Sequence, residues 1–123
     1  MILGIGTDIT EIARISKSIE NKRFTIKVFS KAEIEYCETK TNKAENYAAR
    51  FAAKEAFLKA LGTGLRAGIT INEIEIVNDN LGKPSIHLIG KTAEIILDKN
   101  IQTIHVSLSH VKDMAMATVI LEG

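Results

Sequence analysis

The sequence has few of the residues that mark several large classes of protein. It contains one cysteine, Cys37, one proline, Pro84, and no tryptophan in 123 residues. A lone cysteine cannot form an intramolecular disulfide and lacks a CxxC partner, which excludes a disulfide framework and a cysteine-based structural zinc site. We therefore expect a protein of a reducing compartment, the cytoplasm.

An excess of charge of one sign and long apolar runs are also absent. Lys and Arg number 16 against 15 Asp and Glu, a formal net charge of +1, whereas nucleic-acid-binding domains usually carry a marked basic excess. Aromatic residues make up only 5%, so no stacking platform for single strands is expected. No segment reaches the roughly 18 to 20 apolar residues that span a bilayer. Neither a nucleic acid nor a membrane is expected as a partner.

The chain does contain enough apolar residues for a packed core. Their share is 46%, and a chain of this length buries roughly two thirds of the surface that its unfolded form exposes. No linker-like segment or internal repeat interrupts the sequence. We expect residues 1–123 to form one domain.

Hydrophobic periodicity and turn residues predict an α+β domain. Helical spacing predicts a helix over 11–21, a helical region over 24–39 whose second piece begins at the S-x-x-E capping box of Ser30 and Glu33, and a long helix over 42–61. Alternation and turn composition predict strands over 2–10, 74–76, 86–88, 104–110 and 114–121, with a short helix over 91–99. The expected order is βαααββαββ, with a largely antiparallel sheet packed on the long helix.

Charged residues interrupt the apolar face of the long helix. That face, an arc of about 80° at 100° per residue, is formed by Tyr47, Phe51, Leu58 and Leu61. Lys54 projects into its middle, Glu55 lies beside its edge, and Arg50 and Lys59 flank the same surface. One interpretation is structural: Lys54 extends along the edge of the core, and Glu55 pairs with Lys59 on the surface. The other is that these charges form a functional site.

Asp8 is a second anomaly, because it is a carboxylate at the end of an apolar strand. It either caps the helix that begins near Glu11 or belongs to a site. With Glu55 it offers two carboxylates on separate elements, the donor set that Mg²⁺ takes when phosphates and water complete its shell. Nearby lysines would then receive phosphates, an arrangement that suits phosphoryl transfer. Spacing in the sequence does not determine whether Asp8 meets Glu55.

Other motifs are weaker. Gly4-Ile5-Gly6 is not a GxGxxG fingerprint, because position 9 is Ile and no helix begins where one is needed. Ser109 and His110 lack the G-x-S-x-G elbow of hydrolases. His105 and His110 are five residues apart on a predicted strand, so they point to opposite faces and cannot share a metal. Of the two, His110 at the strand end is the better candidate for a ligand contact.

Three segments together resemble the bacterial holo-(acyl-carrier-protein) synthases, a group of 4′-phosphopantetheinyl transferases. The segments are Gly4-Ile5-Gly6-Thr7-Asp8-Ile9-Thr10-Glu11 with Arg14, Arg50-Phe51-Ala52-Ala53-Lys54-Glu55-Ala56-Phe57 with Lys59-Ala60, and His105-Val106-Ser107-Leu108-Ser109-His110. Gly82-Lys83-Pro84 matches a turn of the family as well. The ordered set covers almost the whole chain, which makes the resemblance specific.

The resemblance implies transfer of 4′-phosphopantetheine from coenzyme A to a serine of apo acyl carrier protein, with release of adenosine 3′,5′-bisphosphate, for fatty acid biosynthesis. It implies that Mg²⁺ is required and held by Asp8 and Glu55. Asp8, Glu55 and Lys59 become the catalytic residues, with Glu55 or a water held by the metal removing the serine proton. Lys54 and Lys59 would face the phosphates of coenzyme A, and Arg50 its 3′-phosphate.

Further contacts and the assembly are also implied by the resemblance alone. Coenzyme A contacts would include Lys83, Pro84, Ser109 and His110. The acidic carrier protein would dock on Arg14, Arg23, Phe24 and Lys27. The family forms a homotrimer whose active sites lie between neighbouring subunits.

Two other classes of function compete with this one. A trimer with the same charges could bind coenzyme A or an acidic helix without chemistry, and turnover separates that case from the enzyme. A metal-dependent nucleotide hydrolase could use the same carboxylates and lysines, and it would release phosphate without any acceptor protein.

Overall fold

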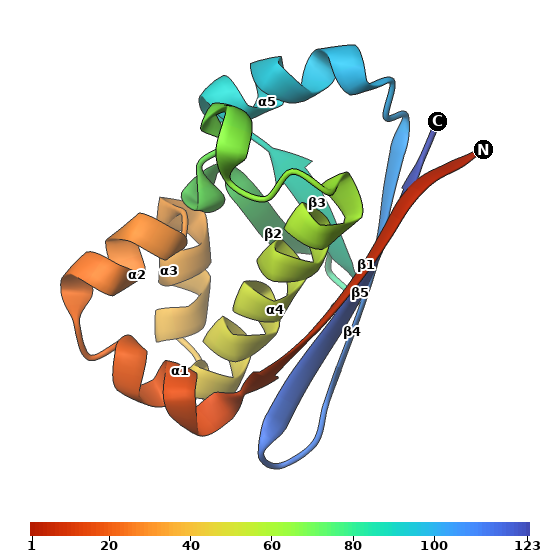
Figure 1. Ribbon diagram of the computed structural model, residues 1–123. Coiled ribbons are helices and arrows are strands. Elements are labelled where there is room, and N and C mark those ends of the chain that lie inside the picture. Colours follow the sequence, from red (N-terminus) through yellow and green to blue (C-terminus); the bar gives the residue numbers. More distant parts are fainter.

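The computed structural model describes residues 1–123 and has the expected α+β architecture (Figure 1). The strands are β1 (Ile2–Glu11), β2 (Ile74–Asn78), β3 (Pro84–Leu88), β4 (Thr103–His110) and β5 (Met114–Glu122). The helices are α1 (Ile12–Ser18), α2 (Lys22–Val28), α3 (Lys31–Glu38), α4 (Lys43–Leu61) and α5 (Gly90–Ile96). Short 3-10 helices are η1 (Arg66–Gly68), η2 (Ile71–Glu73) and η3 (Leu97–Lys99).

Four helices, rather than the expected three, lie between β1 and β2. The helical region over 24–39 is two separate helices because Phe29 and Ser30 both have extended backbone between α2 and α3. Ser30 then starts α3 through the predicted capping box, in which its hydroxyl accepts from the Glu33 N–H and Glu33 accepts from the Ser30 N–H. A helix that begins with such a box cannot continue the one before it.

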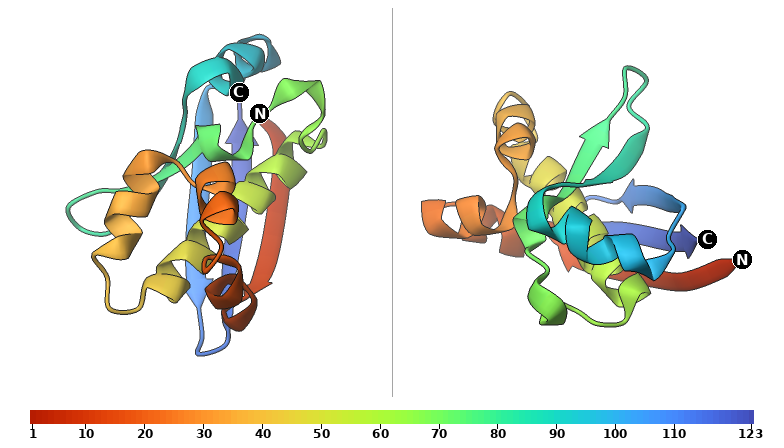
Figure 2. Two further views of the ribbon diagram at one scale, coloured as in Figure 1. Left: turned by 90° about the vertical axis from the view of Figure 1, so that its left-hand side faces the viewer. Right: turned by 90° about the horizontal axis from the view of Figure 1, so that it is seen from above.

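The strands form two sheets instead of one, and every pair of strands is antiparallel. The larger sheet has the order β1-β5-β4, and β2 and β3 form a hairpin of their own. In the larger sheet Asp8 lies opposite Ala117. The amino and carboxyl termini meet at one corner, where the Met1 amino group donates to the Gly123 carbonyl at 2.7 Å (Figure 2).

The long helix α4 crosses one face of the larger sheet (Figure 1). Glycines in β1 face alanines in α4, so the two backbones nearly touch. A Cβ at Gly6 would lie 2.0 Å from the Ala56 carbonyl oxygen, and one at Gly4 would lie 2.1 Å from that of Ala60. No side chain fits at these two positions. This close approach brings the end of β1 directly beside α4.

Two apolar clusters pack on different sides of α4. One fills the space toward the larger sheet and the β2-β3 hairpin, with Phe57, Ile74 and Val119 among its members. The other joins α4 to α1, α2 and α3, with Tyr47 and Phe29 at its centre. None of the helices combines the length and the hydrophobicity that a membrane span requires. With a core on each side, α4 is the central element of the fold.

The second face of the larger sheet has no helix over it (Figure 1). Its side chains, which we call the outer face, include Ile5, Ile9 and Met116, exposed at 66%, 61% and 43%. Scattered single apolar residues are common on protein surfaces, whereas neighbouring ones on two paired strands form a patch. Ile9 pairs directly with Met116 across β1 and β5.

Candidate active site

Asp8 meets Lys59 where β1 lies against α4. The Lys59 ammonium donates to Asp8 Oδ1 at 3.1 Å and to the Thr7 carbonyl at 3.0 Å. The Thr10 hydroxyl donates to Asp8 Oδ2 at 2.8 Å and so fixes the other carboxylate oxygen. The alternative of Asp8 as a helix cap is wrong, because α1 begins after Glu11 without a side-chain cap.

Glu55 lies close enough to Asp8 for the two negative charges to interact. Burial and the nearby Asp8 carboxylate raise the pKa of Glu55, and Lys59 and Arg14 oppose the shift. The ion pair of Lys59 is with Asp8 and not with Glu55, so the interpretation of Glu55 and Lys59 as a surface pair is wrong. An open cleft of about 420 Å³ adjoins these groups and is lined by Glu55, Leu58, Lys59, Gly62, Gly64 and Leu65.

The donor set suits a hard divalent cation with few protein ligands. No group of three or more His, Cys, Asp or Glu side chains is placed to hold a metal, which leaves the pair Asp8 and Glu55. Two neighbouring carboxylates repel each other, and a cation bound between them removes that repulsion. Mg²⁺ commonly takes one or two carboxylates and keeps water or phosphate in its other positions. The residues present therefore fit Mg²⁺ better than a metal that needs a complete protein cage.

Arg50 lines a second cavity, of about 320 Å³, on another side of α4. The residue is 3% exposed and its guanidinium carbon lies 4.3 Å from the centroid of the Tyr36 ring. One terminal nitrogen donates to Asn78 Oδ1, whereas Nε is buried without a partner. A buried donor left unpaired is costly. Arg50 thus contributes a buried cation to the lining of this cavity, and its Nε has no acceptor within the chain.

Ser109 and His110 line this Arg50 cavity together with Gly82. The His110 Nε2 atom lies 2.8 Å from Glu45 Oε1. Lys83 follows Gly82 in the turn before β3, and Pro84 is the first residue of β3; neither residue lines the cavity. The structure therefore gathers three of the predicted contact residues, Arg50, Ser109 and His110, in one place.

The two sites do not merge within one chain. Arg50 and Glu55 are five positions apart on α4, which separates their directions by roughly 140° around the helix axis. The cleft at Glu55 and the Arg50 cavity share no lining residue. One chain thus carries two separate candidate sites, the cleft at Glu55 and the Arg50 cavity, which face different directions.

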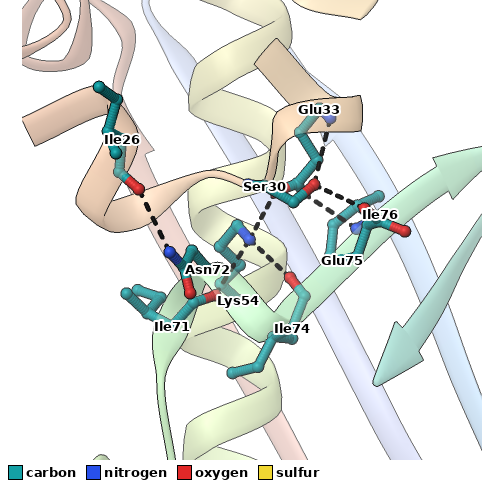
Figure 3. A network of polar contacts seen from close by, with 9 residues as sticks. All are labelled: Ile26, Ser30, Glu33, Lys54, Ile71, Asn72, Ile74, Glu75 and Ile76. Atoms are coloured by element: carbon teal, nitrogen blue, oxygen red, sulfur yellow. Dashed lines mark hydrogen bonds and ion pairs between the residues drawn. The ribbon is translucent and has the colours of Figure 1, made fainter. Parts of the chain in front are cut away.

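Lys54 lines neither of these cavities, so the predicted contact between Lys54 and the phosphates of coenzyme A is wrong. Its side chain is 0% exposed, and its ammonium lies 2.7 Å from Glu33 Oε1. It also donates to the carbonyls of Ile71 and Ile74 (Figure 3). Burial lowers the pKa of Lys54, and the Glu33 carboxylate opposes this. With all three protons engaged inside the protein, Lys54 cannot reach a phosphate, nor does it extend along an exposed edge.

The predicted carrier-docking residues lie on α1 and α2. Arg14 is exposed and stacks its guanidinium over the Phe51 ring at 5.8 Å. Phe24 is half-buried, with its ring 6.4 Å from that of Phe51. Arg23 and Lys27 are exposed on α2. Because Phe51 is one turn before Glu55 on α4, Arg14 and Phe24 border the side of α4 that carries Glu55.

Sequence reasoning missed three residues that shape these sites. In the sequence Asn78 is only the first residue of the turn between the two strands, Glu33 is the acid of the capping box, and Glu45 is the acid three residues after the helix start at Asn42. Each acts through a partner far away in the sequence, Arg50, Lys54 and His110 respectively. No local pattern could have found these pairings.

Comparison with known proteins leads to the same family that the three sequence segments resemble. The family model described as the 4′-phosphopantetheinyl transferase superfamily matches residues 4–119. A holo-[acyl-carrier-protein] synthase of Syntrophus aciditrophicus is 50% identical over 125 residues, covering 100% of this chain and 98% of its own. One from Geotalea daltonii is 48% identical, with 99% of each chain covered.

Solved structures show the same similarity in three dimensions. The holo-[acyl-carrier-protein] synthase of Neisseria meningitidis superposes with a TM-score of 0.88 at 34% identity, covering 100% of both chains. That of Bacillus anthracis, solved in complex with coenzyme A (3′,5′-ADP), gives 0.82 at 35% identity, covering 98% of this chain and 96% of that one. With sequence and fold in agreement over nearly all of its length, the chain belongs to the 4′-phosphopantetheinyl transferase superfamily.

Proposed function

We propose that this protein transfers the 4′-phosphopantetheine group of coenzyme A to a serine of apo acyl carrier protein, in support of fatty acid biosynthesis. The observation that carries the proposal is the meeting of Asp8, Glu55 and Lys59 beside an open cleft. Two carboxylates and a lysine match what phosphoryl transfer needs, namely positioning and neutralisation of charge. The relatives that carry the name of this activity match the chain from end to end.

The chemical step follows from the products. The serine hydroxyl oxygen forms a bond to the phosphorus that carries pantetheine, and the bond from this phosphorus to the bridging oxygen breaks. Adenosine 3′,5′-bisphosphate leaves with the electron pair, and the serine proton passes to Glu55 or to an adjacent water. Lys59, held at 3.1 Å from Asp8, is placed to bind a phosphate oxygen on which negative charge develops.

Mg²⁺ is the cofactor in this proposal, with Asp8 and Glu55 as its protein ligands. When bound, it would neutralise the charge of the phosphates that undergo transfer. The fit rests on two neighbouring carboxylates whose negative charges repel each other, without a third Asp, Glu, His or Cys positioned to bind the same ion. The Thr10 hydroxyl on Asp8 would keep that ligand in one orientation.

The Arg50 cavity binds the nucleotide part of coenzyme A in the proposal. Arg50 is the one Lys or Arg that lines this cavity, and a guanidinium binds a phosphate through charge-assisted hydrogen bonds. Ser109 and His110 line the same cavity, and Lys83 and Pro84 follow its lining residue Gly82 in the chain. The Helicobacter pylori relative, at 33% identity and a TM-score of 0.83, was solved in complex with coenzyme A.

We further propose a homotrimer with its active sites between subunits. The half-sites at Glu55 and Arg50 face different directions on one chain, so a complete site needs a second copy. The outer face, with Ile5, Ile9 and Met116 exposed, offers an apolar surface for that contact. The acidic carrier protein then docks on Arg14, Arg23, Phe24 and Lys27, and charge complementarity mainly raises its association rate.

The remaining expectations are proposals of the same kind. Residues 1–123 form one phosphopantetheinyl transferase domain that acts in the cytoplasm, where its lone, buried Cys37 stays reduced. The balanced charge of the chain, +1, gives no basis for a nucleic acid partner.

Intact-protein mass spectrometry tests the proposed reaction. Apo acyl carrier protein is incubated with this protein, coenzyme A and Mg²⁺, beside an identical sample with EDTA. A phosphopantetheine mass gain on the carrier only when Mg²⁺ is free supports the proposal. No gain in either sample from folded protein contradicts it and favours binding without chemistry, whereas phosphate release without a carrier favours a hydrolase.

A further inference from the structure

Lys54 and Glu33 form a fully buried ion pair where α3, α4 and β2 meet (Figure 3). Both side chains are 0% exposed. The Lys54 ammonium has three acceptors, which are Glu33 Oε1 and the carbonyls of Ile71 and Ile74. An ammonium has three protons, so each one is used.

Glu33 is equally well satisfied, and one of its three partners lies in β2. Oε1 also accepts the Ser30 N–H at 2.8 Å, and Oε2 accepts the Ile76 N–H at 2.9 Å. The Ser30 hydroxyl donates to Glu75 at 2.7 Å. The start of α3 and the strand β2 are thereby joined through one carboxylate.

These bonds fasten β2 to α4 at a defined position along the helix. Lys54 holds the backbone at residues 71 and 74, and Arg50, one turn earlier on the same side of α4, holds Asn78. After Asn78 the chain makes the turn that contains Gly82, which lines the Arg50 cavity. The position of one cavity wall therefore depends on the bonds made by Glu33 and Lys54.

Stability alone does not account for a polar pair at this place. Replacing a buried ion pair by well-packed apolar side chains is often neutral or stabilising, because the two charges no longer have to be desolvated. Apolar side chains would still pack α3 against α4. They would not bind the carbonyls of Ile71 and Ile74 or the Ile76 N–H, so the position of β2 along α4 would be less well defined.

We propose that Glu33 and Lys54 are positioning residues for the nucleotide half of the active site. They hold β2 so that Asn78 and the Gly82 turn stand at the right distance from Arg50. This inference rests on the proposed function, in which Arg50 binds the 3′-phosphate. It assigns the pair to coenzyme A affinity and leaves the Asp8 and Glu55 half unaffected.

Two variants and one control test the inference. Glu33→Gln keeps the shape of the side chain but loses one acceptor, and the double variant Glu33→Gln/Lys54→Met removes both charges. We expect the KM for coenzyme A to rise, and the affinity for adenosine 3′,5′-bisphosphate by calorimetry to fall, by about tenfold each. Both kcat at saturating coenzyme A and the half-saturating Mg²⁺ concentration should stay at wild-type values. Lys43→Met breaks the exposed Lys43–Glu38 pair, which also links α3 to α4, and should change none of these.

The readouts separate failure of the inference from failure of the proposed function. Wild-type protein that binds the bisphosphate but transfers nothing contradicts the function, while the affinity comparison still tests the pair. Wild-type KM and affinity in a variant that circular dichroism shows to be folded overturn the inference. So does a fall in kcat with unchanged KM. If Glu33→Gln, which leaves the buried Lys54 ammonium without a counter-charge, does not fold, the double variant, which removes both charges, decides alone.

Discussion

Asp8 and Glu55 contribute charge to the cleft without holding the fold together. The contact between β1 and α4 is made by glycine and alanine backbone, so either carboxylate can be neutralised without loosening it. We expect Asp8→Asn and Glu55→Gln each to lower the transfer rate on the order of a hundredfold. The melting temperature should change little.

Transfer to apo acyl carrier protein, followed by mass spectrometry, measures this effect. Glu94→Gln, which neutralises an exposed carboxylate on α5, is the matched control and should retain wild-type activity. Full activity in either site variant would remove that residue from the proposed metal site.

Cys37 provides a pH-dependent test of the core at the same scale. Burial, the main cause, raises the pKa of its thiol from 9.0 to about 11. Because the folded state binds this proton more tightly than the unfolded state, the stability it contributes is complete below pH 9 and is lost as pH rises toward 11. Relative to Cys37→Ala, the wild-type protein should lose on the order of 2 kcal/mol between pH 8 and pH 11.

Urea unfolding of both proteins at several pH values measures that difference directly. A cavity left by Cys37→Ala lowers stability equally at all pH values, so only the change with pH reports on the thiol. A constant difference between the two proteins would show that Cys37 does not titrate in this range.

At the scale of elements, two helix starts look alike in the sequence and differ in the structure. Ser30 and Asn42 each precede a glutamate by three residues, but only Ser30 caps its helix through its side chain. Ser30 also bonds to Glu75. We expect Ser30→Ala to cost about 1–2 kcal/mol of unfolding free energy and Asn42→Ala a few tenths. Equal losses by chemical denaturation would contradict this reading of the two caps.

The elements themselves could be predicted because their signals are local. The capping box at Ser30, the left-handed Gly62 that ends α4 and the turn between β2 and β3 are each written in neighbouring residues. The break between α2 and α3 was less clear, since Phe24 to Phe29 is a short apolar run without a period. Periodicity does not distinguish one bent helix from two short ones.

The site was predictable in part for a different reason. The family resemblance named Asp8, Glu55 and Lys59, and the structure does bring Lys59 to Asp8. Lys54 was misread because a charge on an apolar helix face has two meanings, and the partner that decides between them, Glu33, lies on another helix. Contacts between distant residues depend on packing, which no single stretch of sequence encodes.

At the scale of the whole molecule, the direction in which the half-sites face predicts how subunits must cooperate. If each site takes Glu55 from one copy and Arg50 from its neighbour, Glu55→Ala and Arg50→Ala proteins are inactive alone. Mixed in equal amounts, dissociated and reassembled, they should recover activity, because about a quarter of the interfaces in random trimers would join an intact Glu55 to an intact Arg50. Light scattering checks that the trimers re-form. Recovery near a quarter of wild-type turnover requires sites shared between subunits, and no recovery in re-formed trimers would place both residues of each site in one chain.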